Sequence, residues 1–416
     1  MPTTITLPQF DAAADRAAKN LRATGKLFEM RLPAGDVGSI NIGASNNGAE
    51  MKLDPQTWLS KGFSGIRFIG AGTDKTFVRC TSWDGITLLC ARHAGVVQTE
   101  NLHLFAGYSR ATVMGAQNLA KEIVPQFKFV MLGCKGTVLP PEEIGHSGRT
   151  FWLLFGYQCD QYLADCELDA NQAAEHANYA HGWAKTGCLW ERVTVRSSGA
   201  EQLKARGPAS ETAWVGPNTW VQARNCSFGD WGQPWSNRGA GAGIVLQGVG
   251  SNVLVQDCIF RGGVPNAAFQ AHERSKCIMI SSEADSYDAV TGKVPAPPDP
   301  SKPQGPASGF GNGYVAIRRC MVEGHSEVEW GNTVMRCAQT TGTQQAARGF
   351  LVDKCGSWGQ KTVAQASEIP VGQTIIGGCN TPEIRERCAA LGMRVDNETT
   401  YPTSARKVPL SEGIRR

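Results

Sequence analysis

The chain has 416 residues, which is enough for two or three ordinary domains or for one large β domain. Its 41 Lys and Arg nearly balance 37 Asp and Glu, and this balance argues against nucleic-acid binding as the main function. Only 19% of residues are charged and 48 are Gly, which favours short strands joined by many turns. No apolar run is long enough to span a membrane, and residues 1–9 lack the features of a secretion signal. We therefore expect neither membrane insertion nor secretion.

The first 35 residues predict an N-terminal cap made of a helix and a strand. Thr6 and Gln9 have the spacing of a helix-capping box, an apolar stripe follows them, and Gly25 ends the helix. A strand over residues 28–32 comes next, and Pro33-Ala34-Gly35 turns it. Because an open end of a β domain exposes unpaired backbone groups, we expect this helix to cover that end.

A repeated unit follows, in which an alternating strand and a short polar pair precede a buried position that is often Cys. The equivalent positions are 101, 134, 166, 193, 226, 258, 283, 320, 355 and 379. A strand-and-turn unit repeated ten times predicts a β solenoid of about ten or eleven coils. Small apolar thiols stacked coil after coil would fill its interior, so we interpret the cysteines as free and structural. Disulfides between neighbouring coils are the alternative.

The predicted solenoid covers residues 36–380 and is interrupted by loop insertions. We place these insertions near 171–185, 230–240 and 292–309, and the last of them is rich in Pro and therefore extended. Residues 381–416 predict a short C-terminal helix and an extended tail.

The segments FDAAADRAAKN (10–20), MRLPAG (30–35) and GIRFIGAGTDKTFV (65–78), with the strand-and-Cys units after them, resemble the pectate-lyase-like right-handed parallel β-helix superfamily. The resemblance implies an all-β fold, a single-stranded right-handed parallel β-helix with an N-terminal capping helix and a short C-terminal helix. The superfamily includes polysaccharide lyases, glycoside hydrolases, and phage tailspikes and other virion proteins. It therefore specifies the fold more closely than the function.

Three carboxylates form the candidate catalytic group. Asp165, Glu167 and Asp169 alternate along one strand, so we expect all three to point outward beside Arg192 and Arg196 of the next coil. Crowded carboxylates raise one another's pKa and neighbouring arginines lower it. Paired carboxylates suit glycoside hydrolysis, whereas calcium bound by the same three is an alternative, and a solvated ion-pair ladder is another. No other cofactor or metal is expected.

Aromatic residues in the insertions form a second candidate set. Trp231, Trp235 and Arg238 lie in one insertion, and Trp183 lies in another together with His176, Tyr179 and His181. Rings beside Arg suit sugar stacking and equally suit subunit contacts or packing on neighbouring coils. With Arg192 and Arg196, the Trp residues and Arg238 are the predicted carbohydrate or interface contacts.

Two functions fit these features. The first is a phage virion structural protein of tailspike, collar or decoration type, most like the superfamily's virion members. We expect it to be a homotrimer located in the virion, in contact with other virion proteins and with host-surface polysaccharide. The alternative is an extracellular carbohydrate-active enzyme, a polysaccharide lyase or glycoside hydrolase, acting on an acidic polysaccharide. The sequence leaves catalysis itself undecided.

Overall fold

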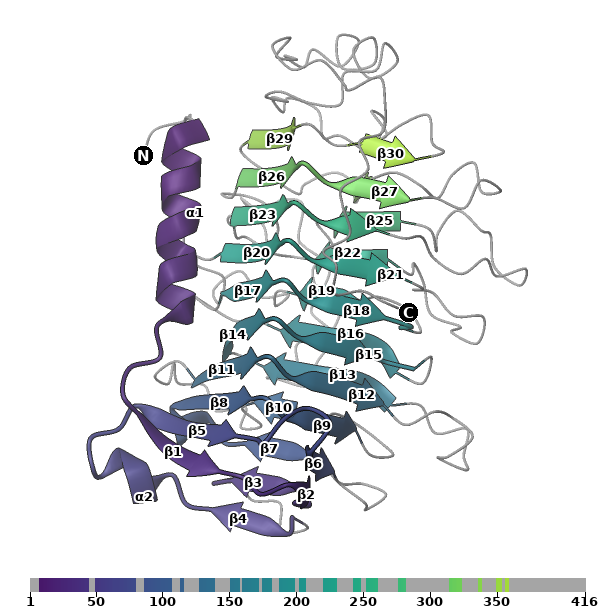
Figure 1. Cartoon of the computed structure of the whole chain (residues 1–416). Helices are drawn as coiled ribbons and strands as arrows, with labels where there is room; N and C mark the ends of the chain where they lie inside the picture. The colour runs from purple at the N-terminus through teal and green to yellow at the C-terminus, as the bar shows by residue number, and fades with distance from the viewer. Residues whose placement is uncertain are drawn as a thin grey trace, which may run out of the picture.

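The computed structural model of the chain is a parallel β-helix in which each coil contributes one strand to each of three sheets (Figure 1). It describes residues 7–44, 49–79, 86–106, 113–115, 127–138, 150–157, 159–171, 174–181, 187–198, 202–206, 220–229, 242–247, 252–260, 276–281, 314–323, 336–338, 349–353 and 356–358. Each sheet has ten strands, and neighbouring strands within a sheet run parallel. The predicted parallel β-helix of about ten coils is therefore confirmed.

Sheet A consists of β1 (Leu27–Arg31), β5 (Gly65–Ile69), β8 (Val96–Glu100), β11 (Phe127–Leu132), β14 (Cys159–Ala164), β17 (Cys188–Glu191), β20 (Trp220–Arg224), β23 (Asn252–Gln256), β26 (Tyr314–Arg318) and β29 (Gly349–Asp353). Sheet B consists of β2 (Gly35–Asp36), β6 (Thr76–Arg79), β9 (His103–Ala106), β12 (Lys135–Val138), β15 (Glu167–Asp169), β18 (Thr194–Arg196), β21 (Ser227–Gly229), β24 (Ile259–Phe260), β27 (Met321–Glu323) and β30 (Gly356–Trp358). Sheet C consists of β4 (Met51–Leu53), β3 (Ile40–Ile42), β7 (Leu88–Cys90), β10 (Val113–Gly115), β13 (Thr150–Tyr157), β16 (Ala174–His181), β19 (Leu203–Arg206), β22 (Ala242–Gln247), β25 (Lys276–Ser281) and β28 (Arg336–Ala338).

The turn from sheet A to sheet B explains the repeated sequence unit. In the seven turns from β8–β9 to β26–β27, one residue adopts the left-handed conformation: it is Gly133 in one turn and Asn101, Asp165, Arg192, Asn225, Asp257 and Arg319 in the others. Asn and Asp tolerate this conformation better than most residues. The residue after it points into the core, and in five described coils it is Cys134, Cys166, Cys226, Cys258 or Cys320.

Two members of the predicted repeat were wrong. Leu102 occupies the buried position in its coil, because Asn101 is the left-handed turn residue before it. Position 283 follows β25 of sheet C and so does not belong to this turn. Since Gln256 pairs in register with Arg318, the chain from Cys258 to Cys320 is one coil rather than two.

The cysteines are structural, as predicted. The eight cysteines whose side chains the structure describes are all free and buried. The thiol of Cys166 lies 3.3 Å from the carbonyl oxygen of Met131 in the coil before it, and Cys226 lies 3.4 Å from that of Trp190. Burial raises the pKa of Cys134 to about 11, which keeps the thiol protonated and unreactive at neutral pH.

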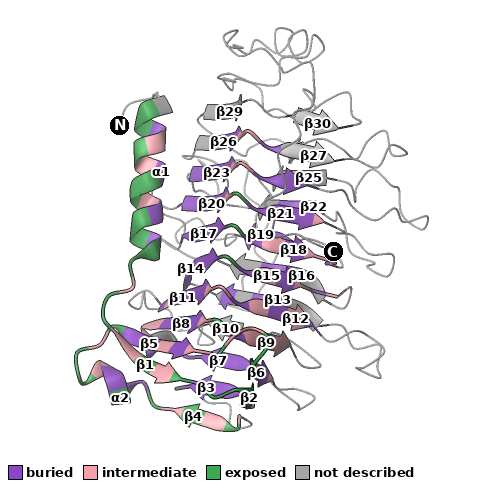
Figure 2. Ribbon diagram, in the orientation of Figure 1, coloured by how far each residue is buried: buried purple, intermediate pink, exposed green. Residues whose placement is uncertain are grey.

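Helix α1 (Leu7–Arg22) confirms the predicted helix but not its position. It runs along the side of the stack, parallel to its axis, instead of covering the end (Figure 1). Its buried face contains Phe10, Ala14, Ala18 and Leu21, and its opposite face is exposed (Figure 2). Phe10 packs against Trp220 with ring centroids 5.1 Å apart, so the amphipathic stripe matches the outer face of sheet A.

The N-terminal end of the stack is filled by a different helix, α2 (Gln56–Leu59). Its Trp58 is buried and stacks on Phe28, with ring centroids 6.5 Å apart. Phe63 packs edge-on against Phe28. The predicted Thr6 cap, the Pro-rich insertion and the C-terminal helix lie outside the described residues. In the part of the chain that is described, neither α1 nor any other helix is long and apolar enough to cross a membrane.

A buried carboxylate on β14 leads to a pH prediction. Asp160 is 8% exposed and accepts a hydrogen bond from the Gly187 amide, with N and Oδ1 2.8 Å apart. Burial raises its pKa to about 6, although Gly187 and Lys128 oppose the change. Because the folded pKa is above the unfolded one, the group contributes its full stability below about pH 4 and loses it as pH rises through about 6.

We therefore expect Asp160→Asn, which keeps the acceptor but not the charge, to raise the free energy of unfolding by about 2–3 kcal/mol at pH 8 and to leave it nearly unchanged at pH 4. Urea unfolding at both values measures this difference. Asp74→Asn, at a side chain 83% exposed, is the control. Equal effects of Asp160→Asn at the two values would contradict the prediction.

Candidate functional site

The predicted carboxylate row is only partly correct. Glu167 and Asp169 lie on β15, half-exposed on either side of the buried Leu168, as the alternation predicted. Asp165 is not on the strand, because it occupies the left-handed turn position with φ 55°. The register pairs Glu167 with Thr194 and Asp169 with Arg196, so the predicted alignment with the next coil is confirmed.

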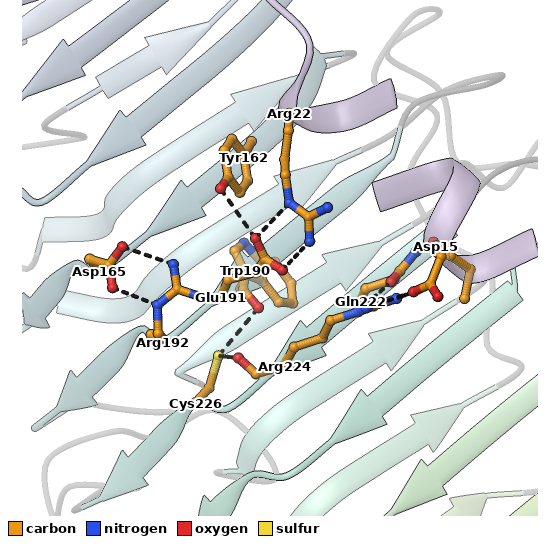
Figure 3. A network of polar contacts seen from close by, with 11 residues as sticks. Asp15, Arg22, Tyr162, Asp165, Trp190, Glu191, Arg192, Gln222, Arg224 and Cys226 are labelled. Carbon is orange, nitrogen blue, oxygen red and sulfur yellow. Dashed lines mark hydrogen bonds and ion pairs between the residues drawn. The ribbon is translucent and has the colours of Figure 1, made fainter. Parts of the chain in front are cut away.

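These carboxylates form an ion-pair ladder with the arginines of the next coil. Asp165 and Arg192 make two hydrogen bonds, of 2.6 and 2.9 Å (Figure 3). The Glu167 carboxylate lies 3.2 Å from the Arg196 guanidinium. The hydrogen bond from Arg192 holds the pKa of Asp165 below its usual value, the opposite of what a catalytic acid requires. Asp165 thus has the properties of a structural ion pair, which was one of the three predicted alternatives.

The calcium alternative has no support from this geometry. Among the residues that the structure describes, no group of three His, Cys, Asp or Glu side chains could hold a metal ion. Asp165 is turned away into its pair with Arg192, and Asp169 accepts a hydrogen bond from the Asn171 amide. Trp183, Trp231, Trp235 and Arg238, the predicted aromatic contacts, lie outside the described residues.

Sheet A is not available as a ligand surface over most of its length, because α1 covers it. Strand β14 is buried at all six positions, whereas β15 and β18 of sheet B alternate half-exposed and buried residues. Three ion pairs hold α1 in place: Asp11 with Arg318, Asp15 with Arg224, and Arg22 with Glu191 (Figure 3 shows the last two). The outer faces of sheets B and C are the remaining candidates.

Sheet C brings together residues that the sequence analysis had assigned to a loop. The predicted insertion at 171–185 contains β16, so most of it is a regular strand of the solenoid. The register aligns Tyr157, His181, Arg206 and Gln247 on four successive strands. A second column, two residues earlier, contains Phe155, Tyr179, Lys204 and Val245.

These two columns alternate along the strands with core positions of sheet C. The alternate column contains Leu203 and Ile244, which are 0% and 1% exposed in the core. Strands in a sheet are about 4.8 Å apart, so His181 and Arg206 occupy adjacent register positions on neighbouring strands. We call Tyr157, Tyr179, His181, Lys204 and Arg206 the sheet C site.

The sequence of residues 171–185 indicates a strand, although the repeat defined by the Cys positions does not include it. Every coil needs three strands, and residues 171–185 were the only segment available for the third strand of their coil. Within it, Asn178 and Ala180 alternate with Tyr179 and His181, which is the period of a strand with one face inward. A search for the third strand would therefore have predicted β16.

No protein-family model and no curated protein matches the chain. A solved structure described as a mannuronic acid specific polysaccharide family 6 lyase from human gut microbiota is similar to it, with 9% sequence identity and a TM-score of 0.37 over 93% of this chain and 89% of that one.

Proposed function

We propose that this parallel β-helix protein is carbohydrate-active and binds and cleaves an acidic polysaccharide at the sheet C site. The observation that carries the proposal is the strand register, which aligns His181 with Tyr157 and Arg206 on three successive strands of sheet C. The ladder of Asp165 and Arg192 has no part in the proposed chemistry.

The residue types of the sheet C site match the requirements of such a reaction. Arg206 and Lys204 supply cations for a sugar carboxylate, and Arg can bind a carboxylate with two parallel hydrogen bonds. His181 supplies an imidazole, the side chain most often used to accept or donate a proton in catalysis. Tyr157 and Tyr179 supply rings for contact with the sugar and hydroxyls for hydrogen bonding or proton transfer.

The test measures new reducing ends released from a panel of acidic polysaccharides, an assay that detects both lyase and hydrolase cleavage. We expect the wild type to cleave at least one of them, and His181→Ala and Arg206→Ala to lower the rate by about 10²- to 10⁴-fold. Arg16→Ala is the matched control, because Arg16 is on the exposed face of α1.

Absence of cleavage by the wild type on every polysaccharide would contradict the proposal, and so would full activity of both variants. The virion location, the homotrimer and the contacts with other virion proteins stay predictions. Trp231, Trp235 and Arg238, which could make such contacts, lie outside the described residues.

A further inference from the structure

A compact group of rings lies on the outer face of sheet B, away from the sheet C site. It is formed by neighbouring residues of β6, β9 and β12, which we call the sheet B cluster: Phe77, Arg79, His103, Phe105 and Thr137. The register aligns Phe77 with His103, and Arg79 with Phe105 and Thr137. Val78 and Leu104, which alternate with them, are 1% and 0% exposed in the core. The cluster therefore belongs to the outer surface.

The side chains of the cluster hold one another in place. The rings of His103 and Phe105 are stacked with centroids 3.9 Å apart. The Phe77 ring is at nearly equal distances from the two, with centroids 6.0 Å from His103 and 5.9 Å from Phe105. The guanidinium carbon of Arg79 is 4.5 Å from the centre of the Phe105 ring. The Nε2 atom of His103 is 2.7 Å from the Thr137 hydroxyl oxygen. A ligand would meet a preformed surface and would not have to order these groups.

Outward-facing aromatic residues are buried on sheet A but half-exposed on sheet B. Outward-facing Trp220 and Tyr162 of sheet A are buried beneath α1. Phe77, His103 and Phe105 remain half-exposed, and no helix lies over them in the part of the chain shown as ribbon in Figures 1 and 2. Half-exposed rings over which no described helix lies suit contact with the apolar face of a sugar ring.

The charges around the cluster favour an acidic sugar. Lys135 is in register with His103, and its ammonium is 3.1 Å from the carboxylate of Asp74, a side chain 83% exposed. Such exposed pairs contribute little, so a ligand carboxylate can replace that of Asp74. The Nε atom of Arg79 is buried without a hydrogen-bond partner, since Asp36 is 3.7 Å away. Two cations thus border the rings: Lys135, which is paired with an exposed carboxylate, and Arg79, whose contact with Asp36 is long.

The protonation of His103 does not disturb this arrangement near neutral pH. Burial lowers its pKa to about 4, with Lys135 and Arg79 lowering it further and Asp74 raising it. The imidazole is therefore neutral and can stack on Phe105 without repelling Arg79.

We propose that the sheet B cluster is a second polysaccharide-binding site, at which a pyranose ring of an acidic polysaccharide packs against the exposed parts of Phe77, His103 and Phe105 and its carboxylate binds Lys135. The choice of ligand rests on the proposed function, whereas the position of the site does not. The sheet B cluster holds one part of the polysaccharide, while another part of the same polysaccharide binds at the sheet C site.

Affinity electrophoresis tests the site in gels that contain a polyuronate, a sulfated polysaccharide or a neutral glucan. All chains carry Arg206→Ala, so that cleavage of the polymer is slow during the measurement. We expect Phe105→Leu to weaken polyuronate binding about tenfold, and Lys135→Gln to weaken it similarly without affecting the neutral glucan. Phe63→Leu is the matched control, because Phe63 is a half-buried ring with Lys26 over it at the end of the stack. Lys19→Gln is the control for charge.

The outcomes separate this inference from the proposed function. If the wild type cleaves polyuronate but the gel retards Phe105→Leu and Phe63→Leu equally, the second site is overturned and the proposed function stands. Stronger binding of the sulfated or neutral polymer overturns the assignment of the ligand as a carboxylated sugar. A native mass above that of one chain, reduced by Phe105→Leu, identifies the cluster as a protein contact and also overturns it.

Discussion

Replacing Arg22 by Ala should lower the free energy of unfolding by about 2–3 kcal/mol at pH 7, because it leaves a buried carboxylate without its partner. The Glu191 side chain is 8% exposed, and its oxygens lie 2.9 Å from Nε and 2.5 Å from Nη2 of Arg22 (Figure 3). Tyr162 donates a further hydrogen bond of 3.1 Å. We expect less than the 3–5 kcal/mol of a fully buried pair, because Arg22 is 41% exposed and water can reach the gap.

The pH dependence separates this mechanism from simple loss of helix packing. Burial alone would raise the pKa of Glu191, but Arg22 and Tyr162 hold it below its usual value. The pair therefore contributes its stability above the unfolded pKa of about 4.3 and loses it as pH falls through the folded pKa. Without Arg22, the pKa of Glu191 should rise, so the variant's deficit should shrink as the solution is acidified.

Urea unfolding of Arg22→Ala at pH 7 and pH 5 measures both the deficit and its change. Lys19→Ala is the matched control, since Lys19 is an exposed basic residue in the same last turn of α1. The double variant Arg22→Ala, Glu191→Gln should recover part of the loss, because no charge is then left buried. A deficit that is the same in the double variant would show that helix packing, and not the charge, is responsible.

Replacing Phe228 by Ala should lower stability by about 3–5 kcal/mol, because it opens a cavity in the middle of the stack. Phe228 and Phe260 occupy the same register position in successive coils, and both are 0% exposed. Their rings are stacked, with centroids 4.9 Å apart and planes 16° apart. Closely packed coils cannot collapse around a missing ring without moving their strands, so most of the cavity should remain.

The effect should also be local, because each coil of a solenoid contacts mainly its neighbours. Hydrogen exchange of Phe228→Ala should show faster exchange in β20, β21, β23 and β24, and little change in β1, β5 and β8. Phe228→Leu should cost less than about 1.5 kcal/mol and leave the exchange pattern unchanged. Acceleration spread evenly along the chain would show that the coils unfold as one unit and would contradict the prediction.

The sequence predicted the fold well because the solenoid repeats one local rule. The left-handed turn residue and the buried position after it recur coil after coil, so errors at one member, such as Asn101 for Leu102, did not change the conclusion. The position of α1 was not predictable in this way. Its apolar stripe specifies that it packs on something, but the matching surface is assembled from residues as distant as Trp220 and Arg318.

The candidate site was predicted less well, for an equally physical reason. Alternation along a strand predicted the outward positions of Glu167 and Asp169, but it does not apply to the turn in which Asp165 lies. The pairing of Asp165 with Arg192 depends on two side chains from neighbouring turns reaching each other. The sheet C site depends on register between strands that loops of different length separate, and sequence spacing does not reveal that register.

The position of α1 has a consequence for how the chain is made. Within this sequence the helix leaves the ribosome before any coil, yet Asp11 pairs with Arg318, 307 residues later. At about 5–20 residues per second, that interval lasts about 15–60 seconds. Coils can stack on one another as they emerge, and Ala18 and Leu21 can then pack on β11, β14 and β17, whereas the surface that covers Phe10 is complete only after β26. In a chain whose synthesis stops early, apolar residues of α1 would therefore stay exposed. Quality-control factors that bind exposed apolar segments would then bind near the N-terminus of the truncated chain and not at its C-terminal end.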